Sequence, residues 1–292
     1  MKETAELMKA IATLLWPIFA FVALYIFKPQ IAVLLGRLKK GKIFGQDFEL
    51  TDSLNKLTKS TVELEKETAA LPILETTHEE FETYNVVKEI LSETAHSPKT
   101  ALILLASYLE RDARQLLASM GHLKGQQNIP LSKAIEVLDK QVCGLPGHVP
   151  ISLKFFSEAR NKLIHGGEAS PEDILRAIDS GITILRALRA IPKEVNVVYH
   201  PGVDIFIDPL DKTLITNATG IILETESPGG ITKSFRIFPT TRAHFQKGKR
   251  VAWEWSFELT WGPTWYKDPN THEIKKAWDS STEFIGRHLD EV

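Results

Sequence analysis

The sequence predicts a multidomain α+β protein with an N-terminal transmembrane helix, a helical bundle and a C-terminal antiparallel β sandwich or barrel. Three observations lead to this fold class. An uncharged apolar run occupies residues 10–27, apolar residues recur at helical spacing through the middle of the chain, and apolar and polar residues alternate near its end. A length of 292 residues is enough for about two folded domains in addition to an anchor.

The composition excludes several classes of protein. Hydrophobic residues make up 43% and charged residues 25%, which is ordinary for a globular chain and excludes general disorder. The formal net charge of −2 provides no overall field that would attract nucleic acid or anionic lipid. The single cysteine, Cys143, excludes an intramolecular disulfide and a cysteine-rich zinc site, and it fits a reducing compartment.

The first element, residues 1–28, is expected to be a membrane anchor. Its 18 uncharged residues from Ala10 to Phe27 reach the lower limit for a spanning helix. Five basic residues follow before the first acid, Asp47, so the positive-inside rule places the N-terminus outside and the later domains in the cytoplasm of a single-pass cell (inner) membrane protein. A cleaved signal peptide is the alternative, but its apolar core is about 7–15 residues and ends at a small-residue cleavage site.

Two connecting segments are expected next. Residues 29–50 are basic and amphipathic, and we expect them either to lie along the membrane surface or to extend the spanning helix. Residues 51–72 are expected to form a connecting helix, and from Leu50, just before it, leucines recur every seven residues at Leu57, Leu64 and Leu71. This pattern predicts a short parallel coiled coil and hence a homodimer, whereas the alternative is an amphipathic helix packed on its own domain.

Residues 79–191 show helical periodicity throughout. Ser97-Pro98 and Ser170-Pro171-Glu172-Asp173 are typical helix starts, and Gly121 and Gly166-Gly167 are typical helix ends. We therefore expect four or five helices around one apolar core. The helix that ends at Gly166 contains Arg160, Asn161 and His165 in the arrangement R-N-x-x-x-H.

This motif and the helices around it resemble the HEPN superfamily (higher eukaryote and prokaryote nucleotide-binding domains). The resemblance covers residues 79–191 and includes the upstream helix SPKTALILLASYLERDARQLL. It implies a metal-independent ribonuclease site formed by two protomers. In such a site His165 would act as general base or acid, Arg160 would hold the scissile phosphate, and Asn161 would orient His165 or the phosphate. The alternative is that Arg160, Asn161 and His165 are structural and that the domain only binds or senses a ligand.

Residues 195–292 are expected to form the β domain. Short β-type runs precede a turn at Ser227-Pro228-Gly229-Gly230, and Val251–Trp261 alternates so that Val251, Trp253, Trp255, Phe257, Leu259 and Trp261 share one face. Asp268-Pro269-Asn270 predicts a hairpin turn, and Ser280–Glu283 predicts the start of a short terminal helix. About seven strands are expected, with most tryptophans in the core.

A basic stretch in the β domain is a candidate RNA-binding surface. No acid occurs between Glu226 and Glu254, and phenylalanines lie among the basic residues. The candidate residues are Lys233, Arg236, Arg242, Lys247, Lys249 and Arg250. A solvated hairpin face is the alternative reading of this stretch.

The sequence patterns predict a membrane-anchored dimer with its later domains in the cytoplasm, and the resemblance to HEPN proteins implies that it is an endoribonuclease acting as a defence or stress effector. We expect RNA as its substrate, and an unknown ligand or protein as the partner of the β domain. No cofactor and no metal are expected, because the nine histidines show no ligand spacing such as HExxH. The alternative from another class is a membrane-tethered binding or sensor module without catalysis.

Overall fold

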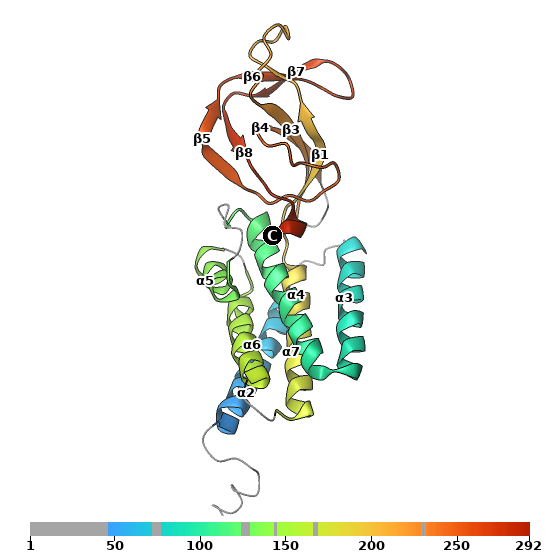
Figure 1. Cartoon of the computed structure of the whole chain (residues 1–292), viewed down its shortest axis with the longest axis vertical. Coiled ribbons are helices and arrows are strands. Elements are labelled where there is room, and N and C mark those ends of the chain that lie inside the picture. The colour runs from blue at the N-terminus through green and yellow to red at the C-terminus, as the bar shows by residue number, and fades with distance from the viewer. Residues whose placement is uncertain are drawn as a thin grey trace, which may run out of the picture. The chain divides into compact units, whose positions relative to one another are not determined.

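The computed structural model describes residues 46–71, 77–123, 129–142, 145–165, 169–228, 230 and 232–292. The chain divides into two compact units, residues 1–52 and 53–292. Only the beginning of helix α2 is described in the first unit. The second unit contains a helical region followed by a β region (Figure 1).

The structure does not support the membrane part of the predicted fold class, and it does not support the predicted single-pass localisation. Among the described residues, no helix has both the length and the apolar character needed to cross a membrane. The run at residues 10–27 and the basic segment at 29–45 lie outside the described residues. The architecture that the structure supports is a helical region and a β region.

The helical region has six described helices. They are α2 (Gln46–Ala69), α3 (Thr77–His96), α4 (Pro98–Ser119), α5 (Leu131–Gln141), α6 (His148–His165) and α7 (Pro171–Ala190). Two predicted starts are confirmed, because the Ser97 and Ser170 side chains accept hydrogen bonds from the backbone N–H groups of Thr100 and Asp173. Helices α4, α6 and α7 pack against one another and share the core (Figure 1).

The apolar residues that predicted the helices do not all face the core. The predicted stripe of α6 is fully buried, as shown by Leu153, Phe156 and Leu163. In α3, by contrast, Val87 and Ile90 are buried, whereas Phe81 and Tyr84 are exposed. Helical spacing therefore identified α3 as a helix but did not identify its buried face.

The leucine seam of α2 is buried within its own chain. Leu54, Leu57 and Leu64 are at most 1% exposed in the single chain. Polar contacts hold the same helix to its neighbours: Lys162 of α6 donates to Ser53, and Arg176 of α7 donates to Asn55 and Thr58. The predicted coiled coil is therefore not supported, and burial of these leucines within the single chain favours the alternative of a helix packed on its own domain.

The β region consists of three small antiparallel sheets. Strands β1 (Val195–Val203), β3 (Thr219–Glu226) and β4 (Lys233–Thr240) form one sheet in the order β1-β3-β4. Strands β2 (Ile205–Phe206), β6 (Thr264–Lys267) and β7 (Ile274–Trp278) form a second in the order β2-β6-β7. Strands β5 (Trp255–Trp261) and β8 (Ser281–Phe284) form the third. The predicted sandwich or barrel of about seven strands is corrected to these sheets, none of which closes on itself over the described residues.

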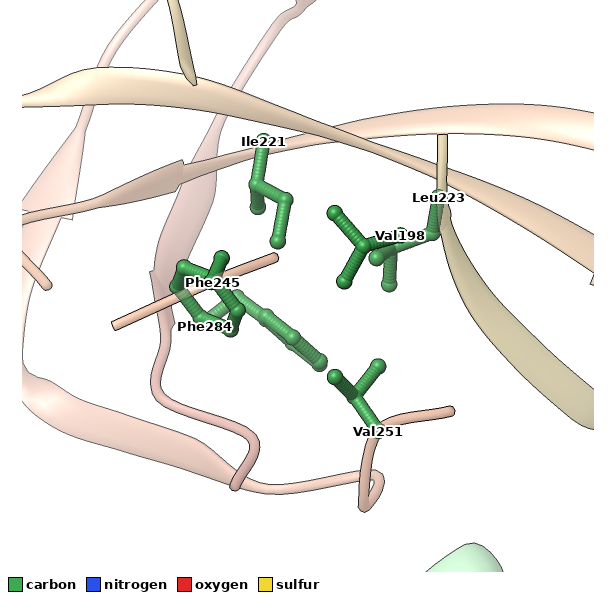
Figure 2. Close-up of a cluster of buried hydrophobic side chains, with 6 residues drawn as sticks. All are labelled: Val198, Ile221, Leu223, Phe245, Val251 and Phe284. Atoms are coloured by element: carbon green, nitrogen blue, oxygen red, sulfur yellow. The ribbon is translucent and has the colours of Figure 1, made fainter. Parts of the chain in front are cut away.

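One core cluster joins the first sheet to the rest of the β region. Figure 2 shows its six buried members, which come from strands and loops far apart in the sequence: Val198, Ile221, Leu223, Phe245, Val251 and Phe284. Trp253 and Trp255 pack against this cluster, and Trp278 belongs to a second one. Trp278 is thus a core residue, whereas Trp253 and Trp255 are partly buried at the edge of the core.

Two predictions about the end of the chain are wrong. The strand predicted over Val251–Trp261 begins only at Trp255, and residues 257–260 within it are exposed, with Phe257 at 80%. On the face predicted to be polar, Glu254 is buried and forms a bidentate ion pair with Arg287 at 2.6 and 3.0 Å.

The segment predicted to start a terminal helix is strand β8, which is followed only by the short 3₁₀ helix η1 (Leu289–Glu291). The predicted hairpin around Asp268 is confirmed by the pairing of β6 with β7.

The β region contacts the end of helix α4. The backbone N–H of Trp253 donates to the carbonyl oxygen of Ala118 at 2.9 Å, and Gln115 Nε2 donates to the carbonyl oxygen of Leu289 at 2.8 Å. Gly121 has φ +79°, and a Cβ at this position would lie 3.0 Å from the carbonyl oxygen of Trp253. Glycine is therefore required both for the turn after α4 and for the close approach of the β region.

Candidate functional site

The R-N-x-x-x-H residues lie in the last two turns of α6. Arg160, Asn161 and His165 all belong to this helix, and His165 is its final residue. Asn161 and His165 are four residues apart, so they share one face, and both are exposed. The three predicted catalytic residues therefore lie within the last six residues of α6, with Asn161 and His165 on one exposed face.

Arg160 is held in place by two hydrogen bonds. Its Nη1 donates to Asn161 Oδ1 at 3.0 Å, and its Nη2 donates to Glu110 Oε1 at 3.1 Å. The Arg160 and Glu110 side chains are 27% and 30% exposed. A guanidinium has five N–H donors, and these two bonds use two of them. The contacts thus fix the direction of the arginine while its side chain remains reachable from solvent.

Glu110 is a site residue that the sequence did not reveal. It lies on α4, fifty positions before Arg160, and no spacing rule connects two residues on different helices at that separation. The packing of α4 against α6 brings the carboxylate to the guanidinium. A residue of this kind is found only when the tertiary structure is known.

The helix that carries the motif is fixed at both ends. At its start, Glu67 of α2 accepts hydrogen bonds from the backbone N–H and the Nδ1 of His148, at 3.0 and 2.7 Å. Burial raises the pKa of Glu67, but these hydrogen bonds outweigh it and the pKa is lowered from its ordinary value of 4.5. Toward its end, Lys162 donates to Ser53 at 2.8 Å. Both ends of α6 are therefore attached to α2.

The basic residues predicted to contact RNA are mostly paired with acids. Lys233 donates to Glu224 at 2.8 Å and Lys249 to Asp290 at 2.5 Å, and these hydrogen bonds raise the pKa of both lysines. Arg236 and Arg242 lie 3.8 and 3.6 Å from the carboxylates of Glu194 and Glu283. Arg250 lies beside β1 through its bridge to Val197. Lys247 differs from the other basic residues, because its Nζ lies 5.5 Å from the centre of the Tyr199 ring.

One group of side chains in the described part of the chain has the spacing of a metal site. The ligand atoms of His288, Asp290 and Glu291 lie within 4.8 Å of one another. However, the backbone N–H of Gln246 donates to His288 Nε2 at 3.3 Å, which places the proton of the neutral ring on Nδ1, the nitrogen that faces Glu291. Asp290 is already paired with Lys249. Two of the three possible ligands, His288 and Asp290, are therefore engaged in contacts within the chain, and the group fits a metal ion poorly.

Comparisons with protein-family models, with curated proteins and with solved structures found no match. The chemistry of the site follows from three groups. They are a fixed but accessible arginine, an exposed amide and an exposed imidazole within two turns of one helix.

Proposed function

We propose that this chain is a HEPN-like, metal-independent endoribonuclease in which Arg160, Asn161 and His165 act together, and that it works as a homodimer. The observation that supports this proposal best is that Asn161, which accepts a hydrogen bond from the oriented guanidinium of Arg160, shares an exposed helix face with His165. A cation and an imidazole at one open surface are the groups that phosphodiester cleavage through the ribose 2′-hydroxyl requires.

The proposed reaction needs one base and one acid. The imidazole of His165 in one protomer removes the proton of the 2′-hydroxyl, and the 2′-oxygen attacks the adjacent phosphorus. The bond from phosphorus to the 5′-oxygen breaks, and the 5′-oxygen takes a proton from the His165 imidazolium of the second protomer. The products are a 2′,3′-cyclic phosphate and a 5′-hydroxyl. Arg160 stabilises the negative charge that develops on the phosphoryl oxygens.

The proposed dimer does not use the predicted leucine seam, which is buried in α2. It requires that the ends of two α6 helices approach each other, so that two copies of His165 face one phosphate. Exposure of His165 at the last position of α6 is compatible with such an approach.

A second candidate function is favoured by one specific contact. The ion pair of Arg160 with Glu110 joins α6 to α4, and a purely structural role would use the arginine in the same way. In this reading the domain is a binding or sensor module without catalysis. The two candidates make different predictions for His165, which forms no part of that ion pair.

Cleavage by variants of the purified full chain separates these candidates. A fluorescent single-stranded RNA is incubated with excess EDTA and the parent, His165→Ala or His96→Ala. His96 is the matched control, because it is also an exposed histidine at the last position of a helix. The proposal predicts cleavage by the parent and by His96→Ala and a loss of at least about 100-fold for His165→Ala, the low end for general acid–base catalysis. Equal rates for the two alanine variants would contradict it.

A further inference from the structure

Two aromatic side chains meet on the surface of the sheet β1-β3-β4. Tyr199 of β1 and Phe235 of β4 contact each other edge to face, with ring centres 4.8 Å apart and an interplanar angle of 63°. Phe235 is 59% exposed. Although it contacts Tyr199, the Phe235 ring leaves much of its surface open to a further planar group.

Two polar groups from other segments complete the cluster. Lys247, from the loop after β4, lies over the Tyr199 ring. Asn270, from the turn between β6 and β7, donates from Nδ2 to the Tyr199 hydroxyl oxygen at 2.9 Å. Both Lys247 and Asn270 are exposed. We call Tyr199, Phe235, Lys247 and Asn270 the aromatic cluster.

We infer that the aromatic cluster binds single-stranded RNA by stacking a base on Phe235, with Lys247 contacting a neighbouring phosphate. This inference rests on the proposed function for the identity of the ligand. A π-face beside one cation and one amide fits a nucleotide, which presents a base plane, a phosphate and hydrogen-bonding edges.

The surrounding charges favour stacking over a continuous phosphate track. Lys233, Arg236 and Lys249 are engaged with Glu224, Glu194 and Asp290, so their charges are largely compensated. The carboxylate of Glu224, on the strand between the two rings, is likewise compensated by Lys233. Binding should therefore depend weakly on salt, because one phosphate contact to a single strand gives a slope of only about −0.7 in log K against log salt.

The test measures binding separately from cleavage. Fluorescence anisotropy of a labelled twelve-nucleotide oligouridylate is recorded with the full chain carrying His165→Ala, so that the probe stays intact. Phe235→Ala and Tyr199→Ala are added to this background. Phe257→Ala is the matched control, because Phe257 is an exposed phenylalanine on β5, outside the cluster. Thermal unfolding checks that each variant is folded.

We expect Phe235→Ala and Tyr199→Ala each to weaken binding about ten-fold, the size of one lost base stack, and Phe257→Ala to leave it unchanged. The salt slope should remain near about −0.7. Equal binding by Phe235→Ala and its parent would overturn the inference, and so would a steep salt slope or an absence of RNA binding. If the His165→Ala chain binds RNA through the cluster but the unaltered chain does not cleave RNA, the proposed function fails while this inference stands.

Discussion

Arg160 of α6 and Glu110 of α4 form a hydrogen-bonded ion pair of 3.1 Å at the first residue of the R-N-x-x-x-H motif, and both side chains are partly exposed. The carboxylate sets the direction of the guanidinium, while Asn161 Oδ1 accepts a second hydrogen bond from it. The cation that the proposed reaction needs is thus oriented before any substrate arrives, which reduces the cost of arranging it in the transition state.

The first prediction concerns Glu110 as a positioning residue. Glu110→Ala should lower the rate of RNA cleavage at least about ten-fold, because Arg160 loses its orientation. Glu110→Gln keeps an acceptor oxygen and should retain most of the activity. Both variants should change the free energy of unfolding by only about 0–1 kcal/mol, since the pair is about one-third exposed. Equal rates for the Ala and Gln variants would show that the contact has no positioning role.

The second prediction concerns the buried seam of α2. Leu57 is fully buried, so Leu57→Ala should reduce the free energy of unfolding by about 2–5 kcal/mol. Val62→Ala is the control on the same helix, because Val62 is exposed, and should change it by less than about 0.5 kcal/mol. Denaturant unfolding measures both. A small effect at Leu57 together with a change in oligomeric state would instead favour the coiled coil.

The third prediction concerns the acid sensitivity of the β6–β7 turn. A hydrogen bond from Lys275, together with the backbone N–H groups of Asn270 and Thr271, lowers the pKa of Asp268 from 3.8 to about 2. A lowered pKa means that the carboxylate stabilises the turn fully above pH 3.8 and that this contribution is lost as the pH falls through about 2.

NMR titration of the Thr271 amide tests this prediction. In the parent chain its chemical shift should change with a midpoint near pH 2, and in Asp268→Asn that step should be absent. A midpoint near the ordinary value of an aspartate would contradict the hydrogen-bonded geometry of the turn.

The sequence predicted local elements well and long-range arrangement poorly. Ser97 and Ser170 mark helix starts because a cap is formed by residues three positions apart. Phe81 and Phe257 are exposed although each lies in a periodic apolar pattern, because periodicity shows that an element has an apolar face but not whether another element covers it. Glu110 and Tyr199 were missed because their partners are distant in sequence and meet only through the packing of helices or the pairing of strands.

The chemical termini of the cleaved RNA test the central claim most directly. Mass spectrometry of products formed by the full chain in excess EDTA distinguishes a 2′,3′-cyclic phosphate from a 3′-hydroxyl. We predict a 2′,3′-cyclic phosphate with a 5′-hydroxyl, formed by the parent and not by His165→Ala. Products that end in a 3′-hydroxyl with a 5′-phosphate, or no cleavage at all under these conditions, would contradict the assignment of Arg160, Asn161 and His165 as a metal-independent ribonuclease site.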